Sequence, residues 1–228
     1  GSNAGRAVTT GRLNTFVGGL AGDATTTANN NTAVGQGSLG ANTTGPENTA
    51  VGVVTLAANT TGASNTAFGR AALNANTTAS FNSAYGTDSL QVNTTGASNT
   101  AIGFRSLFAN TTASNNVAVG KDALTANTTG GTNTAIGVDC LQANTTASDN
   151  TGVGHSALEA NTTGTRNSAV GKNSLGANTT ANDNTAFGHN TLSANTTGNN
   201  NTVVGTSAGS TLTTGVQNTF VGALTGDG

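Results

Sequence analysis

The sequence predicts an all-β fold, a parallel β-solenoid built from coils of 17 residues. Three observations predict it. Asparagine recurs at every seventeenth residue from Asn14 to Asn218 with no insertion or deletion, so residues 14–217 hold twelve complete repeats. Thr, Asn and Gly number 46, 33 and 33, almost half of the 228 residues, and all three are poor helix formers. Each middle repeat places a large apolar residue at the same two positions, which is typical of stacked coils that share one thin core.

The positions of one repeat are numbered here from its first asparagine, so residues 65–81 read NTAFGRAALNANTTASF. Position 5 is Gly in all thirteen repeats, and positions 12–14 are Asn-Thr-Thr in the ten middle ones. We expect positions 1–5 to form one strand and positions 8–12 a second, with corners at the glycine and at positions 15–17. Identical positions would then stack about 4.8 Å apart, and twelve coils would span roughly 58 Å. Asn and Thr ladders are expected to join the coils.

Positions 4 and 9 are predicted to form the core. Position 4 is always a branched or aromatic residue, and position 9 is Leu in the ten middle repeats. The predicted core side chains include Val34, Phe68, Tyr85, Ile102, Ile136 and Phe187 at position 4, and Leu39, Leu73, Leu107 and Leu141 at position 9.

Position 3 is predicted to point outward, because side chains alternate along a strand and position 4 is placed inward. Nine of the ten middle repeats have Ala there, and Gly152 is the exception. A row of small apolar residues suits close approach by another surface, so we interpret it as a self-association surface of a parallel homotrimer. Its members include Ala33, Ala50, Ala67, Ala84, Ala101, Ala118 and Ala135. The alternative is that each alanine sits beneath a turn of its own coil.

The chain is divided into a lead-in, the complete coils and a partial coil. Residues 1–13, which begin with an expression scar at residues 1–4, are expected to lie outside the coils, and residues 218–228 start a thirteenth coil. The first, twelfth and thirteenth repeats have Gly at position 9 and a large residue at position 3, as expected of terminal coils. Gly and Ala alternate at position 15 from Gly62 onward, which indicates either a 34-residue structural unit or duplication of a two-coil module.

Composition excludes several classes of partner. The net charge is −2 with no run of Lys or Arg, which argues against nucleic-acid binding. No apolar run is long enough for a transmembrane helix, so no membrane insertion is expected. We also expect no enzyme activity, no cofactor and no metal. The only histidines, His155 and His189, are two coils apart, and Cys140 stands where other repeats have Ala, Ser or Thr, so it is expected to be a packed thiol.

Aromatic residues at variable positions are candidates for contact with a receptor. Phe104, Arg105 and Phe108 lie in one repeat, and Phe81 ends another. Extra packing at the edge of a trimer is the alternative interpretation of these residues.

Short motifs in the repeats resemble known fibre proteins. NTAVG at 31–35, NTAIG at 133–137 and NSAVG at 167–171 resemble the head-domain repeats of trimeric autotransporter adhesins. The whole unit, with Leu and then Asn-Thr-Thr-Gly, is similar to repeats of phage tail fibres and related virion proteins. The resemblance implies a left-handed β-roll with three parallel chains, although those adhesin repeats are shorter than 17 residues.

The expected function follows from the repeat and this resemblance. We expect a structural segment of a phage tail fibre or bacterial surface adhesin, located on a virion or a bacterial cell surface. It would serve as a shaft or a receptor-binding head, with itself and a host cell-surface glycan or protein as partners. The alternative is an ice-binding β-solenoid that uses the Asn and Thr ladders at positions 12 and 14.

Overall fold

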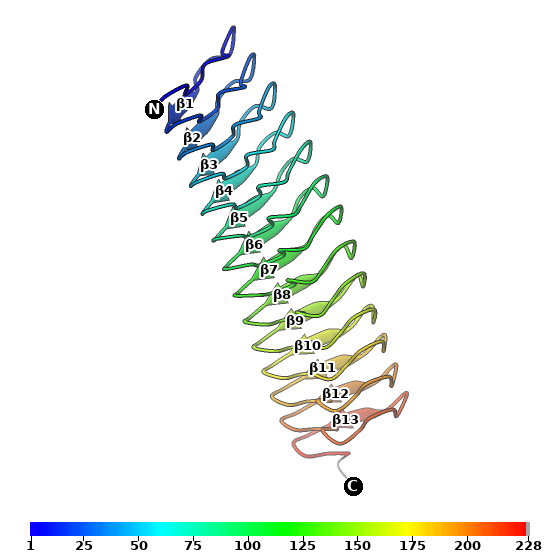
Figure 1. Cartoon of the computed structure of the whole chain (residues 1–228). Coiled ribbons are helices and arrows are strands. Elements are labelled where there is room, and N and C mark those ends of the chain that lie inside the picture. The colour runs from blue at the N-terminus through cyan, green and yellow to red at the C-terminus, as the bar shows by residue number, and fades with distance from the viewer. Residues whose placement is uncertain (227–228) are drawn as a thin grey trace. The chain divides into compact units, whose positions relative to one another are not determined.

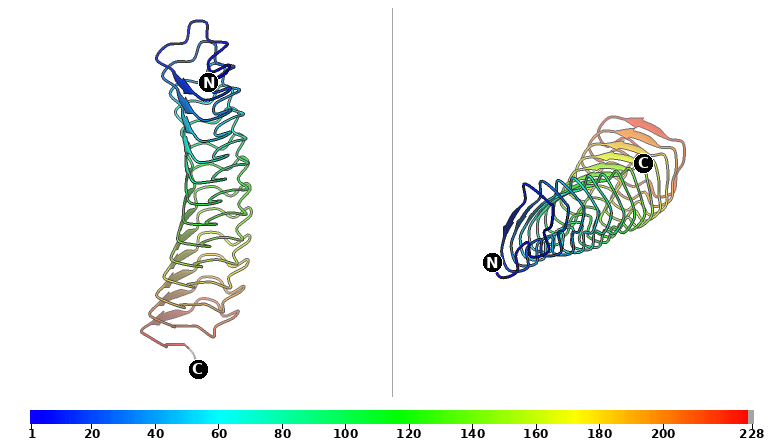
Figure 2. Two further views of the ribbon diagram at one scale, coloured as in Figure 1. Left: turned by 60° about the vertical axis from the view of Figure 1, so that its left-hand side comes forward. Right: turned by 90° about the horizontal axis from the view of Figure 1, so that it is seen from above.

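The computed structural model describes residues 1–226 and confirms the predicted fold class, a parallel β-solenoid with coils of 17 residues. The chain divides into two compact units, residues 1–115 and 116–228, each of which is a stack of such coils (Figure 1). Each coil has one short strand on one side, and turns form the rest of the loop (Figure 2).

All described strands have three residues and occupy positions 2–4 of the repeat. In each unit, consecutive strands pair in parallel with a shift of one repeat, so Thr32, Ala33 and Val34 pair with Thr49, Ala50 and Val51. The strands of the first unit are β1 (Thr15–Val17), β2 (Thr32–Val34), β3 (Thr49–Val51), β4 (Thr66–Phe68), β5 (Ser83–Tyr85) and β6 (Thr100–Ile102). Those of the second are β7 (Val117–Val119), β8 (Thr134–Ile136), β9 (Thr151–Val153), β10 (Ser168–Val170), β11 (Thr185–Phe187), β12 (Thr202–Val204) and β13 (Thr219–Val221).

The second strand predicted at positions 8–12 is wrong, because this segment is a series of turns. Positions 7 and 9 have positive φ angles, as at Val54 (48°) and Leu56 (51°), and such angles are incompatible with an extended strand. The turns still bond to the next coil, since the Leu39 and Ala41 amides donate to the carbonyls of Thr55 and Ala57. Most backbone hydrogen bonds of a coil are therefore made between turns that keep the same register as the strands.

Glycine is required at position 5 for two reasons. Gly35 has a φ of +131°, which residues with a side chain rarely adopt. A Cβ added there would also lie 2.2 Å from the carbonyl oxygen of Gly52, the same position one coil later. The invariant glycine therefore lets successive coils approach closely where the chain leaves the strand.

Two ladders of buried asparagines join the coils, as predicted. At position 12, Asn59 Nδ2 donates to Asn42 Oδ1 at 2.9 Å and to the Gly62 carbonyl, also at 2.9 Å. At position 1, the Asn48 amide donates to Asn31 Oδ1 at 2.9 Å. Threonine adds a further link at position 13, where hydroxyls such as that of Thr43 donate to the backbone carbonyl one coil later. An amide suits such a ladder because it carries both a donor and an acceptor.

The core consists of positions 3 and 9, which corrects the predicted direction of the strand side chains. The leucines at position 9 are fully buried as predicted, including Leu39, Leu73, Leu107 and Leu141. The alanines at position 3, assigned above to a self-association surface, are also at 0% exposure: Ala33, Ala50, Ala67, Ala84, Ala101, Ala118 and Ala135. Position 4, assigned to the core, faces outward. Its members Phe68, Tyr85, Ile102, Ile136 and Phe187 are 36–54% exposed, and Val34 is partly exposed. The leucine fills most of the width of the coil, so only a small residue fits opposite it.

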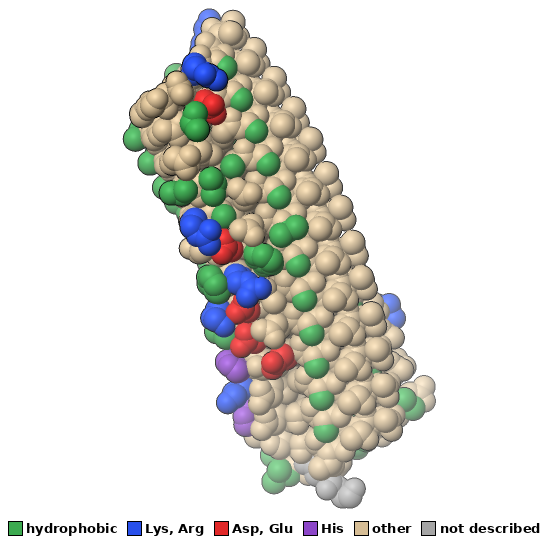
Figure 3. All heavy atoms as spheres, in the orientation of Figure 1, with side chains coloured by type: hydrophobic (Ala, Val, Ile, Leu, Met, Phe, Trp, Pro, Cys, Tyr) green, Lys and Arg blue, Asp and Glu red, His purple; other side chains and the backbone are tan. Residues whose placement is uncertain are grey.

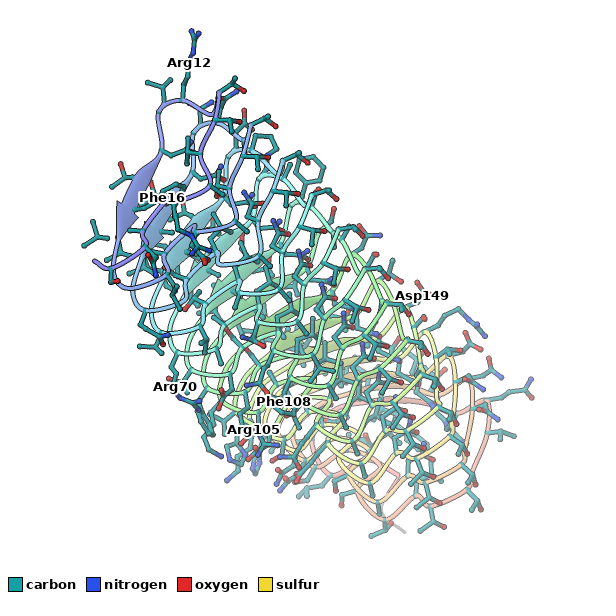
Figure 4. All side chains as sticks on the ribbon, turned by 45° about the horizontal axis from the view of Figure 1, so that its top comes forward. Arg12, Phe16, Arg70, Arg105, Phe108 and Asp149 are labelled. Atoms are coloured by element: carbon teal, nitrogen blue, oxygen red, sulfur yellow. The ribbon has the colours of Figure 1, made fainter. Side chains whose placement is uncertain are left out.

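The end coils exchange volume between these two core positions. Phe16 replaces Ala at position 3 and lies inside the first coil (Figure 4). Position 9 is then glycine, and a Cβ at Gly5 or Gly22 would lie within 2.8 Å of the Phe16 ring. Phe220 packs in the same way against Gly209 and Gly226. A phenylalanine thus occupies the space that leucines of two neighbouring coils fill elsewhere.

Gly152 and Cys140 make a second compensation. Gly152 stands where the other middle coils have Ala, and a Cβ there would lie 2.5 Å from Cys140 Sγ. Cys140 occupies position 8 of the preceding coil, where the larger sulfur takes the space of the missing methyl group. In the coil before, alanines fill both corresponding places, Ala123 and Ala135.

Residues 1–13, predicted to lie outside the coils, follow the path of positions 5–17. The Gly5 and Ala7 amides donate to the carbonyls of Ala21 and Asp23, and Leu20 donates to Ser2. Asn3, Gly5 and Leu13 have the positive φ angles seen at positions 7, 9 and 17 of complete coils. At the other end, residues 218–226 form the predicted partial coil, and residues 227–228 lie outside the described part of the chain.

The alternation at position 15 corresponds to an alternation in hydrogen bonding at position 16. The backbone amides of Ala63, Ala97 and Gly131 each donate to a serine hydroxyl one coil later, at 3.0 Å. The donors belong to coils with Gly at position 15, and the acceptors, Ser80, Ser114 and Ser148, to coils with Ala there. The described coils therefore form structural pairs of 34 residues.

Replacing one ladder asparagine should destabilise the fold strongly. In Asn93→Ala, Asn76 Oδ1 loses its 3.0 Å donor and Asn110 Nδ2 loses a 2.8 Å acceptor, both in buried surroundings. Buried polar groups without partners cost about 1–3 kcal/mol each, so we expect a loss of about 2–4 kcal/mol in urea unfolding. The control is Thr95→Ala, at an exposed side chain two residues away, which should change stability by less than about 0.5 kcal/mol. Equal effects of the two substitutions would contradict a ladder that stabilises the fold.

The pairing of Gly152 with Cys140 can be tested by a double-mutant cycle. Gly152→Ala alone should cost about 1–3 kcal/mol, because the new methyl group overlaps the sulfur. The double variant Gly152→Ala, Cys140→Ala reproduces the Ala135 and Ala123 arrangement and should recover most of that loss. Additive effects in urea unfolding would show that the two positions are not coupled.

Candidate interaction surfaces

The outward side of the strands, here called the strand face, consists of positions 2 and 4. Position 2 is Thr or Ser in all described strands except at Val117, and position 4 is Val, Ile, Phe or Tyr, so neither position carries a charge. In each unit these residues form two parallel rows, one of hydroxyls and one of exposed apolar groups. Sequence reasoning missed this surface because it placed position 4 in the core.

Aromatic residues stack along the apolar row of the first unit. The rings of Phe68 and Tyr85, on neighbouring strands β4 and β5, have centroids 5.2 Å apart and an interplanar angle of 8°. Each is more than a third exposed, so the strand face there presents aromatic surface to solvent. Exposed apolar rows of this kind are typical of protein interaction sites.

Two edges of different charge border the strand face. Position 6, just after each strand, holds Arg70, Lys121, His155, Lys172 and His189 and no acidic residue; we call it the basic edge. Position 17, two residues before each strand, holds Glu47, Asp149 and Asp183 with Arg166 as its one base; we call it the acidic edge. All nine side chains are exposed. Charged side chains, including the two histidines, line one edge of the coils in Figure 3.

Ion pairs join neighbouring coils or residues near these edges. Arg70 Nη2 lies 2.9 Å from Asp88 Oδ2, and Lys121 Nζ lies 2.7 Å from Asp122 Oδ2. On the acidic edge, Arg166 binds Asp183 through two contacts of 2.6 and 2.8 Å. This bidentate hydrogen bonding from Arg166 lowers the pKa of Asp183, so the carboxylate stays ionised over a wider pH range.

The aromatic candidates divide into two locations. Arg105 Cζ lies 4.9 Å from the centroid of the Phe108 ring, a cation–π arrangement that Figure 4 shows within one coil. Phe104 is 45% exposed on the basic edge. Phe81 is 65% exposed at position 17, at the other end of a strand, so it does not share a coil with the other three.

The ladders themselves are not available to an external ligand. Every asparagine at position 12 from Asn42 to Asn195 is fully buried, and the hydroxyls at position 13 bond to the next coil where hydrogen bonds are described. Only the threonines at position 14, such as Thr44 and Thr95, are exposed. An ice-binding face made of the residues at positions 12 and 14 is therefore contradicted by the burial of position 12.

The described residues contain no group of three or more His, Cys, Asp or Glu side chains placed to hold a metal ion. No pocket is found within residues 1–226. Over the same range, no helix is long and apolar enough to cross a bilayer.

Comparison with known protein families, with curated proteins and with solved structures finds no match to this chain.

The buried thiol of Cys140 gives a pH-dependent prediction. Desolvation by burial raises its pKa from 9.0 to about 12. Between these values the unfolded chain loses the thiol proton while the folded chain keeps it, so stability should fall as the pH rises above 9. The loss attributable to Cys140 should be about 1.4 kcal/mol at pH 10.

The measurement compares urea unfolding of the wild-type protein and Cys140→Ala at pH 8 and pH 10. The alanine variant keeps all other titrating groups, so the difference between the two pH responses isolates the thiol. Identical pH responses would contradict a buried thiol, as would rapid labelling of the folded protein by a thiol reagent at pH 8.

Proposed function

We propose that this chain is a structural segment of an extracellular fibre, such as a phage tail fibre or a bacterial surface adhesin. It would act as a shaft or a receptor-binding head on a virion or a cell surface. The observation that carries the proposal is the uncharged strand face, which repeats a threonine and an exposed apolar residue on successive coils of each unit. The resemblance of the NTAVG-type motifs to repeats of such fibres supports the same class.

Self-association is part of this proposal, and the strand face is the surface that would mediate it. The buried alanines cannot contact another chain, whereas position 4 offers apolar groups such as Ile136 and Phe187 to a partner. Burying such groups contributes about 25 cal/mol per Å² of apolar area removed from water. A homotrimer about an axis parallel to the stack would cover the strand face of every copy by the same contact.

Receptor recognition is proposed to lie outside the strand face. The ladders and the core are fixed by stacking, so sequence variation gathers at positions 6, 7, 10 and 15–17. Phe104 and the Arg105–Phe108 pair lie at positions 6, 7 and 10, and Phe81 at position 17. A host cell-surface glycan or protein would meet these residues, and several identical chains in one fibre would raise the avidity.

The proposed assembly predicts the mass of the protein in solution. A homotrimer would have three times the mass of the 21.9 kDa chain by light scattering or sedimentation equilibrium. The paired substitution Ile136→Lys, Phe187→Lys should convert it to monomer, because two charges would be buried against an apolar partner. Circular dichroism should stay unchanged, since both side chains are already exposed in the single chain.

The matched control is Thr146→Lys, Thr197→Lys, which adds the same charge at exposed position 14, away from the strand face. This control should retain the mass of the wild-type protein. A 21.9 kDa species for the wild type up to high micromolar concentration would overturn the assembly, and dissociation by the control alone would place the contact elsewhere.

A further inference from the structure

We infer that the strand face of the second unit contacts a second copy of this chain that runs parallel and in register, with the acidic edge of one copy meeting the basic edge of the other. The inference rests on the proposed self-association and adds its direction, its register and the residues at its borders. Both edges are formed by exposed residues beside strands β9, β10 and β11.

The repeat itself argues for a second copy as the partner. Rows of Thr and apolar groups recur on the strand face once per coil, at the spacing of paired strands. A partner can match many such rows at once only if its own groups recur at the same spacing, and a second copy of the chain meets that condition. Identical side chains on facing sheets can then interdigitate along the whole contact.

The charges at the borders distinguish parallel from antiparallel contact. When two copies face each other about an axis parallel to the stack, the acidic edge of one lies beside the basic edge of the other. When the axis is perpendicular to the stack and lies in the contact plane, like edges meet. The antiparallel arrangement would therefore place Asp149 near Asp183 and His155 near His189, with Lys172 facing its own copy. Charge complementarity favours the parallel arrangement.

The matching is also specific for coil height. Asp149 precedes β9 and His155 follows it, so in a parallel contact in register these two side chains from different copies lie at one level. Asp183 and His189 stand in the same relation across β11. Arg166 and Lys172 meet at the level of β10, but Arg166 is held by its bidentate contact to Asp183 in its own chain. The acidic edge of this segment thus sums to −1, and the basic edge is positive.

Charge reversal on one edge tests the inference, because the two arrangements predict opposite results. Asp149→Lys faces the basic edge in parallel contact and should raise the dissociation constant about fivefold at low salt. In antiparallel contact the same substitution would face Asp183 and tighten association. The measurement is sedimentation equilibrium at pH 6, because histidine side chains titrate near neutrality.

The double variant Asp149→Lys, His155→Asp exchanges the two charges and should restore the wild-type dissociation constant. The control Glu159→Lys makes the same change of charge at position 10, which belongs to neither edge, and should have little effect. All variants are first compared with the wild type by circular dichroism.

The outcomes separate this inference from the proposed function. A wild-type protein that stays monomeric contradicts the self-association itself. A wild-type oligomer whose dissociation constant falls, or does not change, in Asp149→Lys overturns the parallel contact while leaving self-association standing. Weakening by the single variant together with recovery in the double variant supports the inference, and weakening without recovery contradicts the pairing of Asp149 with His155.

Discussion

Contact of each residue with its own counterpart one coil away is the constraint on which the structure depends. With paired strands about 4.8 Å apart, a side chain at a fixed position must tolerate a copy of itself at that distance. Asparagine satisfies this condition when buried because its amide donates to the Oδ1 of one neighbour and accepts from the next, as Asn59 does between Asn42 and Asn76. The constraint explains why buried polar positions are nearly uniform along the chain, while exposed positions vary.

The same constraint fixes the core as a matter of volume. Leucine at position 9 has a left-handed backbone conformation, which costs roughly 1–2 kcal/mol for a residue with a side chain. Complete burial of the side chain offsets this, since it contributes about 1.5–3 kcal/mol. Where Phe16 or Phe220 enters at position 3, glycine replaces the leucine and the strain is removed together with the excess volume. The coil therefore accepts either arrangement but not both large residues.

The sequence predicts the period, the strand position, the glycine corners, the buried leucines and the Asn ladders, because each recurs at fixed spacing. It does not determine which side of a three-residue strand is buried, since Ala at 3 and Val at 4 are both apolar. The correlated change of Phe16 with Gly22 and Phe220 with Gly226 contains that information, because two positions that exchange volume must share one interior. The turns at positions 8–12 were mistaken for a strand because leucine rarely adopts the positive φ found at Leu56.

The placement of charge follows from the same stacking rule and bears on function. A charge at every copy of one position would repel its neighbours, so full charges lie only where solvent screens them or a partner of opposite sign is near. On the acidic edge the signs alternate from Asp149 to Arg166 to Asp183, and Arg166 binds Asp183 directly. Two charged edges then border a face that carries no charge at all. A second chain with the same repeat can satisfy this face and both edges at once, whereas an unrelated partner would match them only locally.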